Sequence, residues 1–168
     1  MAPSTSSKGT RVRVSQAVQT TGIYGISSSA VMAERFEDLR AWQTARALTN
    51  EVYALTKRES LANDWALKDQ IRRAAISVMS NIAEGFESRT RPQFIDFLGT
   101  AKASAGEVRS QLYVAHDQGY LNDEEFEAIS DQADKASRQL YRLIQHLEQN
   151  AGPDHVRELP EEYEYTLR

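Results

Sequence analysis

Apolar residues recur every three or four positions along four segments of the chain, which is the spacing of one face of an α-helix. The pattern predicts helices over residues 35–57, 64–87, 92–118 and 123–149. Charged and polar residues occupy the opposite face of each segment, as is typical of helices in a bundle. In the second segment the apolar stripe consists of Leu67, Ile71, Ala75, Val78, Ile82 and Phe86. No stretch alternates in the manner of a β-strand.

Residues that favour helix ends lie where these stripes begin and stop. Thr90 and Gln93 have capping-box spacing at the start of the third predicted helix, and Asn122 and Glu125 repeat it at the fourth. Gly119 follows the third stripe, where a left-handed residue ends a helix. The short connections require neighbouring helices to run antiparallel. The sequence therefore predicts an all-α, up-down-up-down four-helix bundle.

The helical pattern occupies only the middle of the chain. We expect a bundle over residues 35–150, preceded by a flexible Ser/Thr-rich N-terminal tail over residues 1–34. Gly152 and Pro153 stop the fourth helix, and residues 151–168 are predicted to form a flexible acidic tail. The acidic residues that mark this tail are Glu158, Glu161, Glu162 and Glu164.

Charge is divided unevenly along the 168 residues. Residues 1–109 hold 15 basic and 11 acidic residues, a balance of +4, whereas residues 110–168 hold 5 and 13, a balance of −8. The net charge of −4 argues against a generic nucleic-acid binder, because such domains are usually basic. It leaves open a basic patch on the first helices. The absence of cysteine is compatible with the cytoplasm, and no apolar run is long enough for a membrane span.

The residues that catalysis would require do not occur in recognisable patterns. Di-metal bundles need Glu-x-x-His on two helices, but Tyr113, Leu143 and Gly152 stand three positions before the three histidines. No glycine-rich phosphate loop and no nucleophile motif is present. The sequence therefore predicts no catalytic residue, no cofactor, no metal and no enzymatic activity.

The second predicted helix carries a polar stripe beside its apolar one, which makes Ser77, Asn81 and Glu84 candidates for a helix or subunit interface. Asparagine is a poor residue for a helix interior because its side chain competes for backbone hydrogen bonds. A polar contact across an interface would explain it, and a solvated face is the alternative.

Small residues follow one another along the third predicted helix. Gly99, Ala103 and Gly106 share a face, and each glycine inside a helix costs about 1 kcal/mol relative to alanine. Close approach of another helix would explain them. That helix would belong either to the same bundle or to another subunit.

Arginines supply the candidate nucleic-acid contacts: Arg72, Arg73, Arg89 and Arg91. They lie near predicted helix ends, where patches repeated by symmetry would hold a phosphate backbone through non-specific electrostatics. Acidic neighbours weaken the field around them. The alternative is an ordinary solvated surface.

Several segments resemble the four-helix-bundle family of 23S rRNA intervening-sequence proteins. The resemblance is carried by Asp69–Ala75, Ser80–Phe86 and Phe36–Gln43, supported by Phe94–Leu98 and Gly119–Leu121. It covers roughly residues 35–150 and excludes both tails. Many members have a proline in the second helix where this chain has Met79.

The resemblance implies a bacterial protein without enzymatic activity, of a family often encoded within insertions in 23S rRNA genes. The related accessory proteins of diversity-generating retroelements form barrel-like homopentamers that bind a reverse transcriptase and nucleic acid, but they are strongly basic. We therefore expect a cytoplasmic homo-oligomer, with a pentamer favoured, that associates with RNA, DNA or a ribonucleoprotein. The alternative is a scaffold that docks a protein partner, such as a reverse transcriptase, through helix faces or the acidic C-terminal tail.

Overall fold

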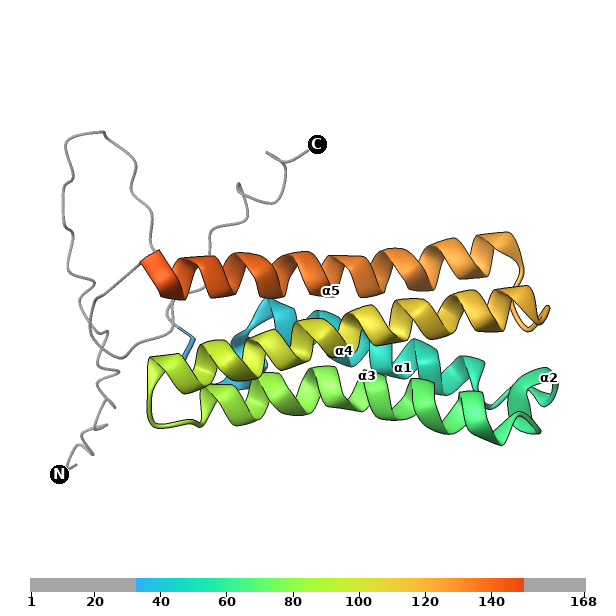
Figure 1. Cartoon of the computed structure of the whole chain (residues 1–168), viewed down its shortest axis with the longest axis horizontal. Helices are drawn as coiled ribbons and strands as arrows, with labels where there is room; N and C mark the ends of the chain where they lie inside the picture. Colours follow the sequence, from blue (N-terminus) through green and yellow to red (C-terminus); the bar gives the residue numbers. More distant parts are fainter. Residues whose placement is uncertain (1–32, 150–168) are drawn as a thin grey trace, which may run out of the picture.

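Four long helices lie side by side in the computed structural model, which describes residues 33–149 (Figure 1). They are α1 (Arg40–Leu55), α3 (Trp65–Phe86), α4 (Arg91–Asp117) and α5 (Asp123–Gln149). A 3₁₀ turn, η1 (Phe36–Asp38), precedes α1, and the short helix α2 (Glu59–Ala62) follows it. All regular structure in the described part of the chain is helical, which confirms the predicted all-α bundle. Residues 1–32 and 150–168, which include nearly all of both predicted tails, lie outside the described residues.

The helices form a ring in which each packs against two neighbours. α3 and α5 each pack against both α1 and α4. Thr49 Oγ1 donates to the carbonyl of Ala75 at 3.1 Å, and Arg72 Nε donates to Thr56 Oγ1 at 2.7 Å. Residue numbers thus rise along α1 as they fall along α3, so these two helices run antiparallel. Figure 1 shows the same reversal between α3 and α4 and between α4 and α5.

The first helix is shorter than the predicted segment 35–57. Leu39 is extended, with φ −71° and ψ 124°, and it separates η1 from α1. The Asp38 carboxylate accepts the backbone N–H of Arg35 at 3.1 Å, which stabilises the tight turn in place of a continuous helix. Leu39 is fully buried, so the break places an apolar anchor beneath the start of α1.

The predicted capping residues occupy the helix ends. Asn122 Oδ1 accepts the backbone N–H of Glu125 at 2.9 Å, and Glu125 accepts that of Asn122 at 3.2 Å, so the capping box is complete. Thr90 accepts the N–H of Gln93 at 3.4 Å. Gly119 has φ +74°, the left-handed conformation that glycine adopts without strain, and it ends α4 as predicted.

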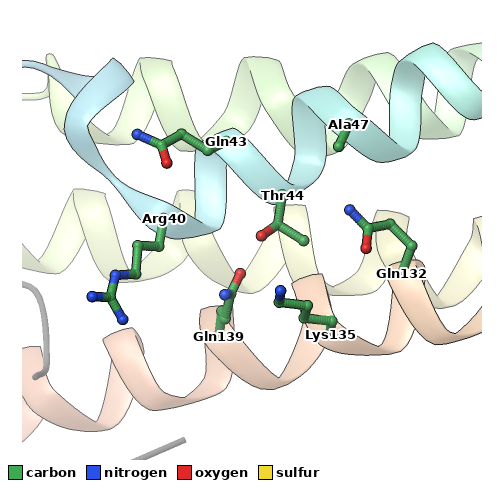
Figure 2. Close-up of a pocket in the computed structure, with 7 residues that line it drawn as sticks. All are labelled: Arg40, Gln43, Thr44, Ala47, Gln132, Lys135 and Gln139. Carbon is green, nitrogen blue, oxygen red and sulfur yellow. The ribbon is translucent and has the colours of Figure 1, made fainter. Parts of the chain in front are cut away.

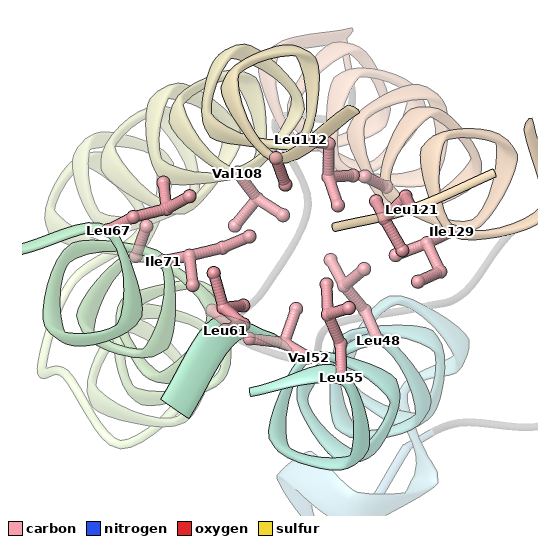
Figure 3. Packing of buried hydrophobic residues seen from close by; sticks show 14 residues of the cluster. Leu48, Val52, Leu55, Leu61, Leu67, Ile71, Val108, Leu112, Leu121 and Ile129 are labelled. Atoms are coloured by element: carbon pink, nitrogen blue, oxygen red, sulfur yellow. The ribbon is translucent and has the colours of Figure 1, made fainter. Parts of the chain in front are cut away.

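Apolar side chains fill the interior in two clusters, one toward each end of the bundle. In the cluster of Figure 3, side chains from all four long helices and from α2 converge on one another. Leu61 of α2 is fully buried there and closes that end of the core. Packed apolar side chains therefore fill the interior of the bundle, and contacts with other molecules would involve its outer faces.

α3 and α4 approach closely where the chain turns between them. A Cβ added to Gly85 would lie 2.6 Å from Phe94 Cδ2 and 2.8 Å from Phe97 Cβ, closer than real Cβ contacts come. A side chain at position 85 would therefore require α3 and α4 to move apart.

Candidate interaction surfaces

The structure gives Arg72 a structural role within the bundle. Its Nε donates to Thr56 Oγ1, and its guanidinium group lies 4.7 Å from the centre of the Tyr53 ring. Thr56 is 1% exposed, so this contact reaches the edge of the core. Arg73, one position on, is exposed and pairs with Asp69 at 2.6 Å on its own helix.

Arg72 and Arg73 lie in the first half of α3, whereas Arg89 lies in the turn after α3 and Arg91 is the first residue of α4. The part of α3 from Arg73 to its last residue, Phe86, covers 13 positions (86 minus 73), which corresponds to about 20 Å at the helical rise of 1.5 Å. Arg89 is exposed and Arg91 is half-buried. The four candidate arginines therefore form two separate pairs within one chain, and only symmetry between copies could join them into a larger surface.

Ser77 and Asn81 lie at the interface between α3 and α4. Ser77 Oγ and Ser104 Oγ are 2.9 Å apart, and Asn81 Nδ2 donates to the Ser77 carbonyl at 2.8 Å and to Ser77 Oγ at 3.0 Å. Ser104 is 7% exposed, so this chain of polar contacts is partly sheltered. Glu84, the third member of the predicted stripe, is exposed.

Gly99, Ala103 and Gly106 face outward on α4 and are exposed. A Cβ added to either glycine would meet no atom within 4 Å. In the described part of the chain, no helix approaches these glycines closely. Of the two explanations that the sequence left open, close approach within the same bundle finds no support, and approach by another subunit remains a hypothesis.

A polar groove that the sequence did not predict runs between α1 and α5, with a volume of about 340 Å³. In Figure 2, Thr44 points from α1 toward the side chains of α5. The other polar side chains that line the groove are Arg40, Gln43, Gln132, Lys135 and Gln139. None of the residues that line it is acidic. The sequence did not reveal the groove because the residues that line it come from two segments almost a hundred positions apart.

Cations also lie over aromatic rings within α1 and within α3. Lys68 Nζ lies 3.6 Å from the ring centre of Trp65, whose side chain is 71% exposed. Arg46 lies 5.8 Å from the ring centre of Trp42. Such contacts stabilise exposed aromatic rings modestly.

Five groups of the described range have shifted pKa values. The hydrogen bond between the Arg35 and Glu37 side chains raises the pKa of Arg35 and lowers that of Glu37. Burial raises the pKa of Glu51, a half-buried residue of α1. The pKa of Glu125 is lowered by the backbone hydrogen bond from Asn122 and then by the hydrogen bond from Arg58. The pKa of Tyr120 is raised by burial and then by Asp64, whose carboxylate accepts its hydroxyl at 3.3 Å. These shifts reflect a helix cap, packing and one ion pair, and they do not gather at one place.

The bundle offers neither a metal-binding cluster nor a membrane-spanning helix among its described residues. Within residues 33–149, no three side chains of the metal-binding types come together as a site. None of the helices in that range combines the length and the apolar character needed to cross a bilayer.

Comparisons with known proteins place the fold. The family model of the 23S rRNA-intervening sequence proteins matches residues 37–142. No curated protein sequence matches the chain. A crystal structure of a protein of unknown function from the S23 ribosomal protein family of Bacteroides thetaiotaomicron VPI-5482 is similar, with a TM-score of 0.58 and 23% identity. The match covers 62% of this chain and 97% of that one.

Proposed function

Because the chain belongs to the family of 23S rRNA-intervening sequence proteins, we propose that it is a non-enzymatic, homo-oligomeric accessory protein of RNA or of a ribonucleoprotein in the bacterial cytoplasm. The observation that carries the proposal is the packing of the interior. Apolar side chains from every long helix fill it, so partners are left to bind on outer faces. A pentamer is the favoured assembly.

The proposed RNA contacts are the arginines in the first half of α3 and those in the turn and first residue that lead into α4. One pair of basic side chains is too sparse to hold a phosphate backbone, whereas a ring of copies would repeat it around an axis. Arg72 contributes less than the others to this surface, because Thr56 and Tyr53 already engage its guanidinium group. The proposed phosphate contacts are therefore mainly Arg73, Arg89 and Arg91.

A filter-binding titration of the full chain against a structured RNA, repeated at several salt concentrations, tests this proposal. The triple variant Arg73→Glu/Arg89→Glu/Arg91→Glu is expected to bind at least about tenfold more weakly. Its salt slope should be smaller by about one for each phosphate that the variant no longer neutralises. Arg138→Glu is the matched control, because this exposed arginine lies on α5 and pairs with Asp134. No affinity at low salt, or equal affinity of the triple variant and the parent, would end the RNA proposal.

The proposed subunit interface is the outer face of α4 around Gly99, Ala103 and Gly106. Open space above the two glycines is what a second helix would use for close backbone approach. Light scattering is expected to give a mass that is a multiple of the 18.9 kDa chain, with five copies favoured. Ala103→Glu should lower that mass, whereas Ala128→Glu, at an exposed position of α5, should not. A monomeric parent protein would refute the assembly.

The same α4 face favours the second candidate function, a scaffold for a protein partner. An exposed face of small, uncharged residues suits a helix of a different protein as well as a second copy. Co-purification of one specific protein that Ala103→Glu or deletion of residues 151–168 abolishes would support the scaffold. A homo-oligomer that loses no partner on these changes would argue against it.

A further inference from the structure

The groove between α1 and α5 has a lining suited to carboxylates. Arg40 from α1 and Lys135 from α5 supply two positive charges, and the amide of Gln132 supplies further N–H donors (Figure 2). Gln43 Nε2 donates instead to the carbonyl of Glu37 at 2.9 Å. Thr44 is 8% exposed and belongs to the sheltered part of the groove. Lys135 forms no ion pair with another residue of the described range. Carboxylates make their strongest hydrogen bonds to cationic donors of this kind.

We propose that this groove binds the acidic C-terminal segment of the same chain, residues 154–164. Residues 151–168 carry five acidic residues against two basic ones, Arg157 and Arg168. All five acidic residues fall within the proposed segment: Asp154, Glu158, Glu161, Glu162 and Glu164. The segment and the groove therefore have opposite charge.

The position of the groove allows the segment to reach it. Gln139 lies ten residues before Gln149, the last residue of α5 (149 minus 139), so the groove is about 15 Å from the end of that helix. This end of α5 and the start of α1 lie at the same end of the bundle (Figure 1). Glu158 follows Gln149 by nine residues, which span up to about 30 Å when extended. Gly152 and Pro153 allow the chain to turn back.

Charge elsewhere on α5 directs the segment toward this groove. The first two turns of α5 are acidic at exposed positions, with Asp123, Glu124 and Glu127, and would repel it. Single exposed ion pairs contribute little, so binding requires several carboxylates and weakens as salt rises. A bound segment would also withdraw Arg40 and Lys135 from any anionic partner. The C-terminal segment would thus act as an internal competitor for the groove.

Disulfide cross-linking of the full chain tests the proposal, because the chain has no cysteine of its own. Ala47, which lines the groove, and Tyr163 are both changed to cysteine. The matched control combines Tyr163→Cys with Ala66→Cys, at an exposed position of α3. The groove pair is expected to cross-link about tenfold faster than the control pair, within one chain and independently of protein concentration, because docking raises the local concentration.

Charge reversal then separates docking from chance encounter. Arg40→Glu/Lys135→Glu in the cysteine variant should slow the cross-link to the rate of the control pair. Changing Glu158, Glu161 and Glu162 to lysine in that background should restore the rate, which a merely misfolded groove would not allow. Far-UV circular dichroism checks that each variant remains helical.

Three results would overturn the inference. The first is equal cross-linking at positions 47 and 66, or a rate that charge reversal leaves unchanged. The second is a product that links two chains, which would place the segment on a neighbouring copy. The third is protection of Ala47→Cys from thiol reagents by a U-rich RNA oligonucleotide while the segment fails to cross-link, which would assign the groove to nucleic acid.

Discussion

Replacing Gly85 by alanine is expected to destabilise the bundle, because the new methyl group would enter the close contact between α3 and α4. Its Cβ would lie 2.6 Å from Phe94 Cδ2, against the 3.4–4 Å of ordinary contacts, so about 0.8 Å must be recovered. Phe94 is 3% exposed and packs edge-on against Phe86, with ring centres 6.2 Å apart. Phe97 Cβ, at 2.8 Å, is fixed to the backbone and cannot swing away.

The magnitude follows from two opposing effects. Overpacking a core contact costs about 1–3 kcal/mol. Alanine recovers at most about 1 kcal/mol of helix propensity relative to glycine, and less in the last turn. The free energy of unfolding of Gly85→Ala should therefore fall by about 1–2 kcal/mol.

Urea denaturation followed by circular dichroism measures this change. The midpoint of Gly85→Ala should move to lower urea with an unchanged slope, since the surface exposed on unfolding is the same. Gly106→Ala is the control, because its Cβ would meet nothing within 4 Å. At a protein concentration where the chain is monomeric, the free energy of unfolding of that control should rise by about 0.5–1 kcal/mol. A Gly85→Ala midpoint at or above the parent value would contradict the packing argument.

Three further predictions concern Arg72, the contact between Ser77 and Ser104, and Glu51. Arg72→Ala should lower the free energy of unfolding by about 1–2 kcal/mol by removing the Thr56 hydrogen bond and the Tyr53 contact, whereas Arg73→Ala should change it by less than about 0.5 kcal/mol. Urea midpoints of the two variants decide this, and equal effects would refute it. In a double-mutant cycle, Ser77→Ala and Ser104→Ala should show a coupling of about 0.5–1.5 kcal/mol, and additive effects would mean that their hydroxyl contact contributes nothing. Burial raises the pKa of Glu51 in the folded chain above its unfolded value. The protonated carboxyl group therefore contributes stability that is fully present below the unfolded pKa and is lost as the pH rises through the folded pKa. Glu51→Gln should therefore be more stable than the parent at neutral pH and lose this advantage in acid, and an advantage that is the same at both pH values would refute it.

Helix positions and caps were predictable because their signals are local. A few adjacent residues determine the capping box of Asn122 and Glu125 and the left-handed conformation of Gly119. Both features occur as predicted. The break at Leu39 was missed, because an apolar residue that follows the helical spacing does not reveal an extended backbone. α2 was missed because four residues are too few to show a period.

The candidate surfaces were harder to predict, because they depend on which helices become neighbours. Arg72 is indistinguishable from Arg73 in the sequence, but one lies against α1 and the other faces outward. Likewise, Gly85 and Gly106 are both glycines inside predicted helices, yet only Gly85 is covered by another helix. The α1–α5 groove joins two segments from opposite ends of the bundle sequence, and no local pattern connects them.

The proposed subunit interface on the outer face of α4 would make demands on its residues that oppose those of the fold. Within one chain, Gly99 and Gly106 only weaken their helix, by about 1 kcal/mol each relative to alanine, and no neighbour in the described bundle benefits from their small size. If the face packs against a second copy, the added methyl groups of a Gly99→Ala/Gly106→Ala variant would hold the two backbones apart. The folded monomer should then become more stable, whereas the assembly should become weaker. The protein concentration at which half of the chains are assembled should therefore rise. If the variant gains monomer stability but assembles as readily as the parent, the subunit interface lies on another face. Substitutions change the assembly equilibrium only where the interface uses the substituted residues.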